Sequence, residues 1–225
     1  MALFFLPNLN ENHKFIELTQ EESKHCIRVL RYKLGDSIEI INGKGLLVEA
    51  SVVDANPKKC SVRIDTSFSF PKTKDIHVAV CPTKSMDRME WLTEKAVELG
   101  ATKITFIYSK NCERPQLKLD RLEKIAVSAI KQSKRYYLPE IMLCPDVKSF
   151  VSQFPGGYIA HCHPGKKMSA VCGLQKGPIM IGPEGDFTKD EVERALQNGY
   201  QALDLGEFRL RTETAALISV FYQCS

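Results

Sequence analysis

Two stretches near the end of the chain carry residue types that could form a ligand site. They are residues 181–187, with the sequence IGPEGDF, and residues 205–215, with the sequence LGEFRLRTETA. Each follows a short apolar run and each leads into a helix-like pattern. Glycine-bearing turns at the ends of neighbouring strands are where an α/β sheet offers its backbone to a ligand. The pair therefore predicts a binding site.

The first stretch has the features of a turn that lets a ligand approach the backbone. Gly182 leaves room for close approach, Pro183 stiffens the turn, and Gly185 is expected to adopt a positive φ. Free backbone groups at such a turn suit the edge of an adenine ring. The G-x-G-x-x-G and P-loop fingerprints are absent, so a standard nucleotide site is not predicted. A simple strand-to-helix turn is the alternative interpretation.

The second stretch adds charged groups to the predicted site. Arg209 and Arg211 lie beside a predicted helix start, where two guanidinium groups can hold a phosphate or a carboxylate. Glu213 falls in the first helical turn, where its negative charge would interact favourably with the helix dipole. This interaction would explain the residue without any chemical role. A surface ion pair is the alternative role for Arg211.

The segment that carries both stretches alternates between strand-like and helix-like patterns. Its predicted strands are 76–81, 103–108, 158–161, 178–181 and 202–205, and its predicted helices are 87–99, 119–137, 189–197 and 213–222. Thr188 and Glu191 have capping-box spacing at the start of one helix. Alternation of this kind predicts a mostly parallel sheet with helices on both faces.

The first 70 residues predict a separate, β-rich, barrel-like module. Its predicted strands are 14–18, 37–41, 46–53 and 60–66, with a hairpin turn at 42–45. One helix interrupts them, and Thr19 and Glu22 have capping-box spacing at its start. The sequence FPKTKD at 70–75 is typical of a linker. The predicted domains are therefore 1–70 and 75–225.

Composition is that of a globular chain long enough for a sizeable core. The 225 residues are 44% hydrophobic and 26% charged, and no apolar run approaches the roughly 18 residues that span a bilayer. The eight cysteines are scattered without a C-x-x-C pair, which predicts reduced thiols and a cytoplasmic location. Cys81 and Trp91 are expected in the core. Neighbouring ligands in His161-Cys162-His163 would point to opposite faces of a strand, so no metal site is predicted.

Positive charge is concentrated in the middle of the chain. The net charge is +4, and residues 71–140 alone carry 14 basic and 9 acidic side chains. Lys131, Lys134 and Arg135 gather beside Tyr136 and Tyr137, a pattern typical of a nucleic-acid contact strip. The alternative is that these basic residues lie on an ordinary solvated surface, where the lysines interact favourably with a helix dipole.

Taken in order, these segments resemble the bacterial 16S ribosomal RNA uridine-N3 methyltransferases of the SPOUT class. The matching motifs cover nearly the whole length. They are Lys24-His25, Val29-Leu30-Arg31, Gly35-Asp36, Lys84, residues 87–91, 94–95 and 98–100, Ala129, Gln132-Ser133, Arg135, Leu138-Pro139, and residues 181–187 and 205–215.

The resemblance implies an N-terminal PUA-like β-barrel that binds RNA. It also implies a C-terminal SPOUT α/β domain with a deep trefoil knot, which acts as a homodimer and binds S-adenosylmethionine. The residues that it places around this cofactor are Ala160, His161, Ile181, Gly182, Pro183, Gly185, Leu205, Gly206, Arg209, Leu210 and Arg211.

The implied reaction is methyl transfer to N3 of a uridine in the decoding region of small-subunit rRNA. Because N3–H is weakly acidic, the site should promote proton loss and stabilise the resulting anion. Arg211 is the predicted charge stabiliser, with Glu213 and Glu184 as polar or proton-handling residues. N3 lies on the Watson–Crick edge, so the base must be unpaired or extruded. Candidate phosphate contacts are Arg28, Arg31, Lys33, Lys84, Arg88, Lys131, Lys134 and Arg135.

Three positions depart from the family pattern, and two other functions stay open. Asp186 stands where the family often has glycine, Cys26 replaces a commoner leucine, and residues 110–115 match only loosely. The first alternative is a non-catalytic RNA-binding or ribosome-assembly factor that retains the fold. The second is a 2′-O-ribose methyltransferase, since other SPOUT members modify the sugar.

Overall fold

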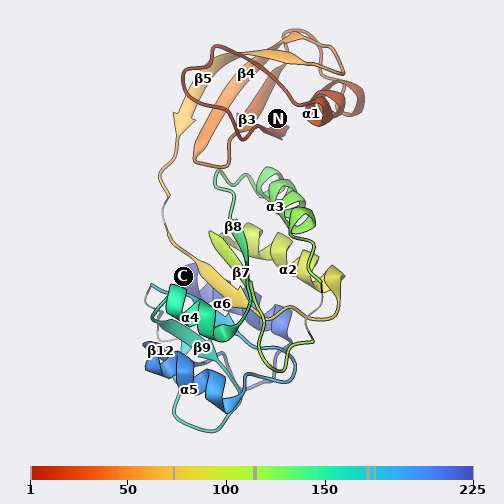
Figure 1. Cartoon of the computed structure of the whole chain (residues 1–225). Helices are drawn as coiled ribbons and strands as arrows, with labels where there is room; N and C mark the ends of the chain where they lie inside the picture. Colours follow the sequence, from red (N-terminus) through yellow and green to blue (C-terminus); the bar gives the residue numbers. More distant parts are fainter. Residues whose placement is uncertain (1, 73, 114–115, 171–172, 175, 225) are drawn as a thin grey trace. The chain divides into compact units, whose positions relative to one another are not determined.

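The computed structural model describes residues 2–72, 74–113, 116–170, 173–174 and 176–224. They form two compact units, and the chain passes between them more than once (Figure 1). The first unit consists of residues 1–73 together with 130–138, and the second consists of 74–129 and 139–225. Two residues of the loosely matching segment, 114 and 115, fall outside the described residues.

The first unit is built on a five-stranded sheet in the order β1-β3-β4-β5-β2. Its strands are β1 (Leu3–Phe5), β2 (Phe15–Glu17), β3 (Ser37–Ile41), β4 (Leu46–Asp54) and β5 (Ser61–Ser69). Strands β3, β4 and β5 form an antiparallel meander, β2 pairs antiparallel with β5, and β1 joins β3 in parallel. The four predicted strands are confirmed, whereas β1 was not predicted.

The predicted helix of this unit has two parts. Helix α1 (Gln20–Lys24) continues into the single π-helical turn η1 (His25–Val29). The Thr19 side chain accepts a hydrogen bond from the Glu22 amide, as a capping box requires. The Glu22 carboxylate instead accepts from the Phe5 amide and pairs with Lys131, so the two carboxylate contacts fix the helix against β1 and residues 130–138.

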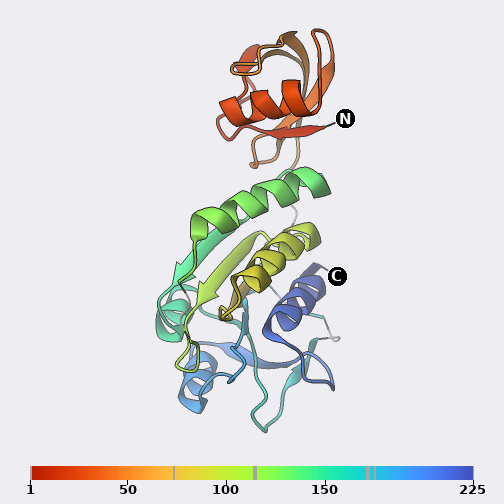
Figure 2. The same ribbon diagram turned by 90° about the vertical axis from the view of Figure 1, so that its right-hand side faces the viewer.

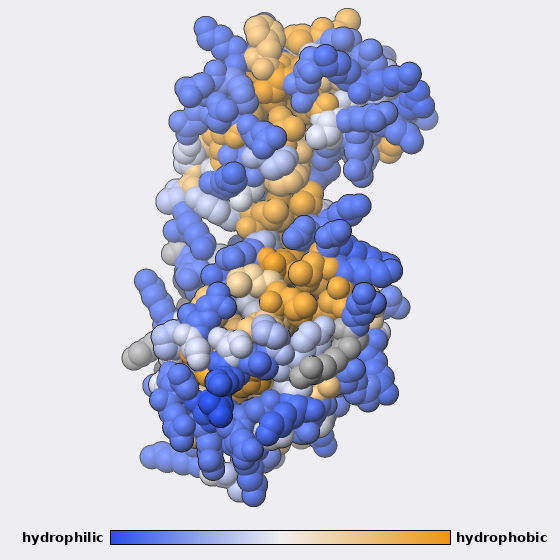
Figure 3. All heavy atoms as spheres, in the orientation of Figure 1, coloured by the Kyte–Doolittle hydropathy of each residue, from blue (hydrophilic) through white to orange (hydrophobic). Residues whose placement is uncertain are grey.

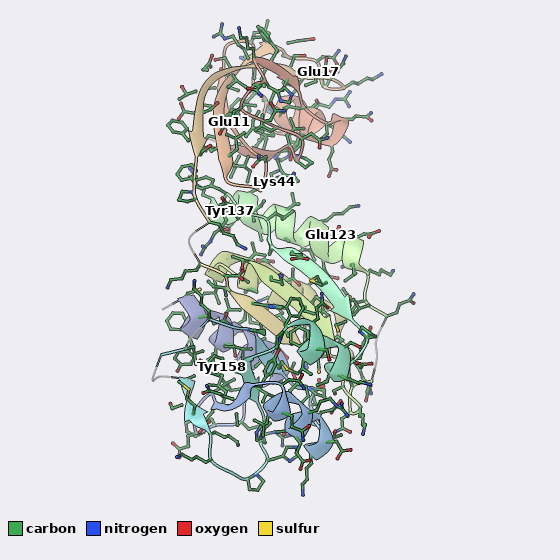
Figure 4. All side chains as sticks on the ribbon, turned by 60° about the vertical axis from the view of Figure 1, so that its left-hand side comes forward. Glu11, Glu17, Lys44, Glu123, Tyr137 and Tyr158 are labelled. Atoms are coloured by element: carbon green, nitrogen blue, oxygen red, sulfur yellow. The ribbon has the colours of Figure 1, made fainter. Side chains whose placement is uncertain are left out.

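Residues 130–138 pack on the hairpin turn of the first unit. The Leu138 amide donates to the Gly43 carbonyl at 2.9 Å, and the Gly45 amide donates to the Tyr136 carbonyl at 3.0 Å. The Tyr137 hydroxyl donates to the Phe70 carbonyl at 2.8 Å. Figure 4 shows Lys44 of the turn beside Tyr137. These contacts account for the end of helix α3 (Leu119–Ser133), four residues before its predicted end.

The second unit contains a seven-stranded parallel sheet in the order β10-β12-β9-β11-β6-β7-β8. The strands are β6 (His77–Val80), β7 (Lys103–Ile107), β8 (Glu140–Cys144), β9 (Gly157–Ala160), β10 (Met168–Ser169), β11 (Ile179–Ile181) and β12 (Tyr200–Asp204). The predicted parallel sheet is confirmed. Strands β8 and β10 were not predicted.

Helices cover both faces of this sheet, as predicted. Beside α3 they are α2 (Met86–Leu99), α4 (Val147–Gln153), α5 (Lys189–Gln197) and α6 (Thr212–Cys224). Helix α6 packs on α2 and on strands β6 and β11, and α4 packs on α5. Figure 2 shows the α2–α6 pair and the α4–α5 pair on opposite sides of the strands. Only α4 was missed, and the capping box of Thr188 and Glu191 is confirmed.

The core of the second unit confirms one expectation and corrects another. Cys81 is fully buried, and burial raises the pKa of its thiol. Trp91 is 46% exposed, so its expected core position is wrong. The buried face of α2 includes Met89, Leu92 and Ala96, and Trp91 lies outside this helical stripe. Within the described residues, no helix is both long enough and apolar enough to cross a membrane.

A buried histidine makes the stability of this unit depend on pH. The ring of His77 is hydrogen-bonded to the Thr105 hydroxyl at 2.8 Å and packs edge-on against Phe150. Burial lowers the pKa of His77 to about 4; the charge of Lys103 acts in the same direction and that of Asp75 opposes it. The folded state disfavours the imidazolium form of His77. The contribution of His77 to stability is therefore fully present above the pKa that this residue has in the unfolded chain, and it is lost as pH falls toward the pKa in the folded state.

We expect this loss to reach about 3 kcal/mol between neutral pH and about pH 4. His77→Gln keeps a hydrogen-bonding side chain but cannot become charged. Over the same pH interval, the free energy of unfolding of this variant should therefore decrease by about 3 kcal/mol less than that of the parent protein. Urea unfolding of both proteins at the two pH values measures the difference. Identical pH dependence would contradict this account of His77.

Candidate active site

A cavity of ≈570 Å³ lies at the carboxyl ends of three neighbouring strands of the second unit, β9, β11 and β12. Its wall is formed by the segments that follow these strands and by the start of α6. Every residue that the resemblance places around the cofactor lies in this wall. The volume is in the range of small-molecule sites, and the place is where open α/β sheets bind ligands.

The turn after β11 is held from several directions. The Thr212 hydroxyl donates to the Gly182 carbonyl at 3.1 Å, and an Arg209 amino group donates to the Glu184 carbonyl at 3.2 Å. A Cβ added at Gly182 would lie 3.2 Å from the ring of Phe187, which is fully buried below the turn. Any larger residue at position 182 would therefore push either the ring or the turn out of place.

Each of the two turns contains a residue with positive φ, and in the first turn it is not the expected glycine. Gly206 has φ +133°, and no atom lies within 4 Å of the Cβ that another residue would carry there. The backbone conformation alone thus selects glycine at this position. In the first turn, the residue with positive φ is Asp186, at +61°, and not Gly185 as predicted. Aspartate tolerates this conformation better than most residues.

The three predicted catalytic residues occupy different places. Arg211 and Glu184 are exposed residues of the cavity wall, and the structure gives neither side chain a partner among the described residues. Glu213 does not line the cavity. Its side chain is 8% exposed and lies 3.6 Å from the Nε atom of Arg88, while its Oε2 atom is buried without a hydrogen-bond partner among the described residues. The structure thus brings two of the three to the cavity.

The histidine on the wall has an unused ring nitrogen. The Nδ1 atom of His161 is buried and has no hydrogen-bond partner among the described residues. Burial lowers the pKa of His161, and the charge of Lys167 adds to this effect, so the neutral ring is favoured. The described residues contain no group of three or more metal-ligating side chains. His161 is therefore a polar group available to an organic ligand.

Some predicted RNA contacts lie at the end of η1 in the first unit. Arg28, Arg31 and Lys33 are exposed, and no partner for their side chains is found among the described residues. Arg31 has φ +62°, so the chain turns sharply between the other two. Arg135, which belongs to the same unit, is also exposed. With no side-chain partner among the described residues, Arg28, Arg31 and Lys33 form a basic edge that is able to contact phosphates.

The other predicted RNA contacts are engaged in ion pairs. Their charges are partly neutralised by carboxylates, which weakens the interpretation of the 131–137 region as an open contact strip. The pairs are Lys131–Glu22 at 2.7 Å, Lys134–Glu39 at 3.6 Å, Lys84–Glu113 at 2.7 Å and Arg88–Glu213 at 3.6 Å.

The cavity also includes residues to which the sequence assigned no role in binding or catalysis. Asp204 ends β12 directly before the second glycine stretch, and Phe208, which is 80% exposed, lies inside that stretch. Both residues are close in the sequence to predicted site residues, and this proximity could have identified them. Cys162 and Asp186 line the wall as well, and nothing in the sequence indicated that they contact each other.

Comparison with known proteins agrees with this arrangement. Residues 71–222 match the RNA methyltransferase domain family, and residues 18–65 match the RNA methyltransferase PUA domain family. The first unit is thus a PUA-like sheet, and the second is a parallel α/β RNA methyltransferase domain, as the sequence predicted.

Similar proteins match over nearly the full length. The ribosomal RNA small subunit methyltransferase E of Mesomycoplasma hyopneumoniae is 32% identical, over 96% of each chain. A probable rRNA methyltransferase from Porphyromonas gingivalis is 36% identical, with a TM-score of 0.90 over 98% of this chain and 95% of that one. The Neisseria gonorrhoeae methyltransferase E, solved bound to S-adenosyl methionine, is 26% identical, with a TM-score of 0.85 over 98% and 95%. The chain belongs to the ribosomal RNA small subunit methyltransferase E family.

Proposed function

We propose that this chain transfers a methyl group from S-adenosylmethionine to N3 of a uridine in the decoding region of 16S rRNA. The observation that carries the proposal is the single cavity whose wall contains every residue expected around the cofactor. The gonococcal relative, described as bound to S-adenosyl methionine, supports the same cofactor here. The likeness to methyltransferase E proteins over nearly the whole chain supports the rRNA substrate.

The residues of the cavity fit this cofactor. Asp204 supplies negative charge for its ammonium group, and Arg209 supplies positive charge for its carboxylate. The two glycine turns let the backbone approach its adenine, and the Nδ1 atom of His161 lacks another partner among the described residues. When bound, the cofactor supplies an electrophilic methyl group.

The chain itself must make uridine N3 nucleophilic. The N3–H proton has to leave, and the negative charge that develops on the ring has to be stabilised. Arg211, an exposed cation of the wall, provides the charge. We assign the acceptance of this proton to Glu184, an exposed carboxylate on the same wall. Glu213 acts behind the wall by holding Arg88, since it does not line the cavity.

The rRNA is bound by the unpaired basic groups of the first unit. Arg28, Arg31 and Lys33 contact phosphates, which gives affinity without reading the sequence. The target base enters the cavity in an unpaired or extruded state, because N3 is otherwise hidden in a base pair. The division into an RNA-binding domain at 1–70 and a methyltransferase domain at 75–225 is part of this proposal.

We propose that the chain works as a homodimer and that its second domain contains the deep knot implied by the resemblance. Helices α2 and α6 pack together and leave Trp91 46% and Phe221 55% exposed. Figure 3 shows the second unit from the other side, that of α4 and α5, where apolar residues gather as well. A second copy of the chain would cover such surface. Light scattering after size exclusion tests this, and the mass of a single chain would contradict it.

The cofactor assignment separates an enzyme from a binding protein. Calorimetric titration of the purified chain with S-adenosylmethionine is expected to show one site per chain, and filter binding is expected to show affinity for small ribosomal subunits. A chain that binds subunits but no cofactor would be an assembly factor. A chain that methylates the 2′ oxygen would keep the fold and the cofactor but not the proposed target.

A further inference from the structure

One side chain connects two walls of the cavity. The Asp186 Oδ2 atom accepts a hydrogen bond from the backbone amide of Cys162 at 2.7 Å, and its Oδ1 atom accepts from the Phe187 amide at 2.8 Å. Cys162 belongs to the segment after β9, whereas Asp186 belongs to the turn after β11. The carboxylate thus bridges two segments that lie 24 residues apart in the chain.

A second contact joins the same two segments. The Nε2 atom of His163 lies 2.6 Å from the Phe187 carbonyl oxygen, which can only accept, so the ring donates from this nitrogen. The Asp186 carbonyl in turn accepts from the side-chain amide of Asn111, at 3.0 Å. Residues 162–163 therefore donate two hydrogen bonds to residues 186–187, and Asn111 holds the turn from outside.

The backbone conformation of Asp186 is one that its side-chain contacts must stabilise. At φ +61° an L-residue is in a sparsely populated region, where glycine would be unstrained. A residue that keeps an unfavourable backbone angle while both carboxylate oxygens are engaged is stabilised by those contacts, and such outliers cluster at functional sites.

We propose that Asp186 is a positioning residue that fixes the segment after β9 against the turn after β11 and so holds the cofactor cavity in its binding shape. This inference rests on the proposed function, because it concerns the same cavity. The carboxylate acts on the Cys162 backbone, and through it on the neighbouring wall residues Ala160 and His161. Its loss should weaken cofactor binding and leave RNA binding intact.

Three variants separate the side chain from the backbone angle. Asp186→Gly keeps the turn, relieves the strain and removes both hydrogen bonds. Asp186→Asn tolerates the same angle and keeps one acceptor, so it should restore part of the effect. Asp190→Asn alters a carboxylate that is 80% exposed near the start of α5 and does not line the cavity, and it serves as the matched control.

Hydrogen exchange of the cofactor-free protein tests the tie directly. In Asp186→Gly the Cys162 amide is expected to exchange about tenfold faster than in the parent protein, because its charged acceptor is gone. Asp186→Asn should show a smaller increase and Asp190→Asn none. An unchanged exchange rate at Cys162 in Asp186→Gly would overturn the proposal, whatever the activity of the variant.

Cofactor titration then tests the consequence. The Kd for S-adenosylmethionine is expected to rise about tenfold in Asp186→Gly, with affinity for small subunits unchanged and kcat at saturating cofactor within about twofold of the parent. Equal cofactor affinity in the parent and in Asp186→Gly would overturn the positioning role. If the parent protein itself bound no cofactor, the proposed function would fail instead. The exchange experiment would still show whether Asp186 holds the Cys162 amide.

Discussion

Replacing Arg211 with alanine is expected to lower kcat by a factor on the order of 10²–10³, with the fold unchanged. The exposed guanidinium lies on the cavity wall and has no side-chain partner among the described residues, so its removal breaks no ion pair. What is lost is the positive charge that would stabilise the uracil anion. Turnover of subunits lacking the modification, at saturating cofactor, measures this effect without a contribution from cofactor affinity.

Two further variants define the role of Arg211. Arg194→Ala removes an exposed arginine of α5 that does not line the cavity and should leave kcat unchanged. Arg211→Lys keeps the charge but not the planar donor group, and we expect an intermediate rate. Full activity in Arg211→Ala would remove this residue from the mechanism.

Phe187→Ala is expected to cause the largest loss of stability, about 3–5 kcal/mol. The ring is fully buried in the core of the second unit and lies directly below Gly182, so its deletion leaves a cavity under the ligand-binding turn. The melting temperature should fall by roughly 6–20 °C. Cofactor affinity should fall as well, because the turn loses its support.

Scanning calorimetry of Phe187→Ala beside Phe208→Ala checks this expectation. Phe208 is 80% exposed, so its truncation should leave the melting temperature within about 2 °C of the parent value. Equal melting temperatures for Phe187→Ala and the parent protein would show that the ring does not support the turn.

The parallel sheet could be predicted from the sequence because its signals are local. Apolar runs and amphipathic stretches alternate, and most element bounds agree with the prediction to within one or two residues. The sequence missed β1 (Leu3–Phe5) and β10 (Met168–Ser169), because two or three residues are too few for an alternating pattern. Strand β8 was missed because it is an edge strand with an exposed Leu143, so its pattern is irregular.

Contacts between distant parts of the chain were beyond local patterns. The packing of residues 130–138 on the turn at 42–45 joins segments about 90 residues apart, so the lysines there were interpreted from charge alone. The wrong position of Trp91 has a similar cause, since a large aromatic residue was expected inside before the buried stripe of α2 was known. The positive φ at Asp186 instead of Gly185 accompanies a hydrogen bond with Cys162, another distant partner.

The candidate site was the more predictable part, because its two glycine stretches are distinctive in sequence. They directed attention to Gly182 and Gly206, which lie in the wall of one cavity. The sequence did not distinguish Glu213 from Glu184, because burial decides between them. Glu213 lies behind the wall with Arg88, and only Glu184 lines the cavity.

The most direct test is methyl transfer from labelled S-adenosylmethionine to small ribosomal subunits that lack the modification. The RNA would be digested after the reaction and its nucleosides separated by mass spectrometry, with Arg211→Ala run in parallel. Labelled 3-methyluridine from the parent protein, and far less from the variant, is the expected result. Label on ribose, or no label although the subunits are bound, would contradict the proposed reaction.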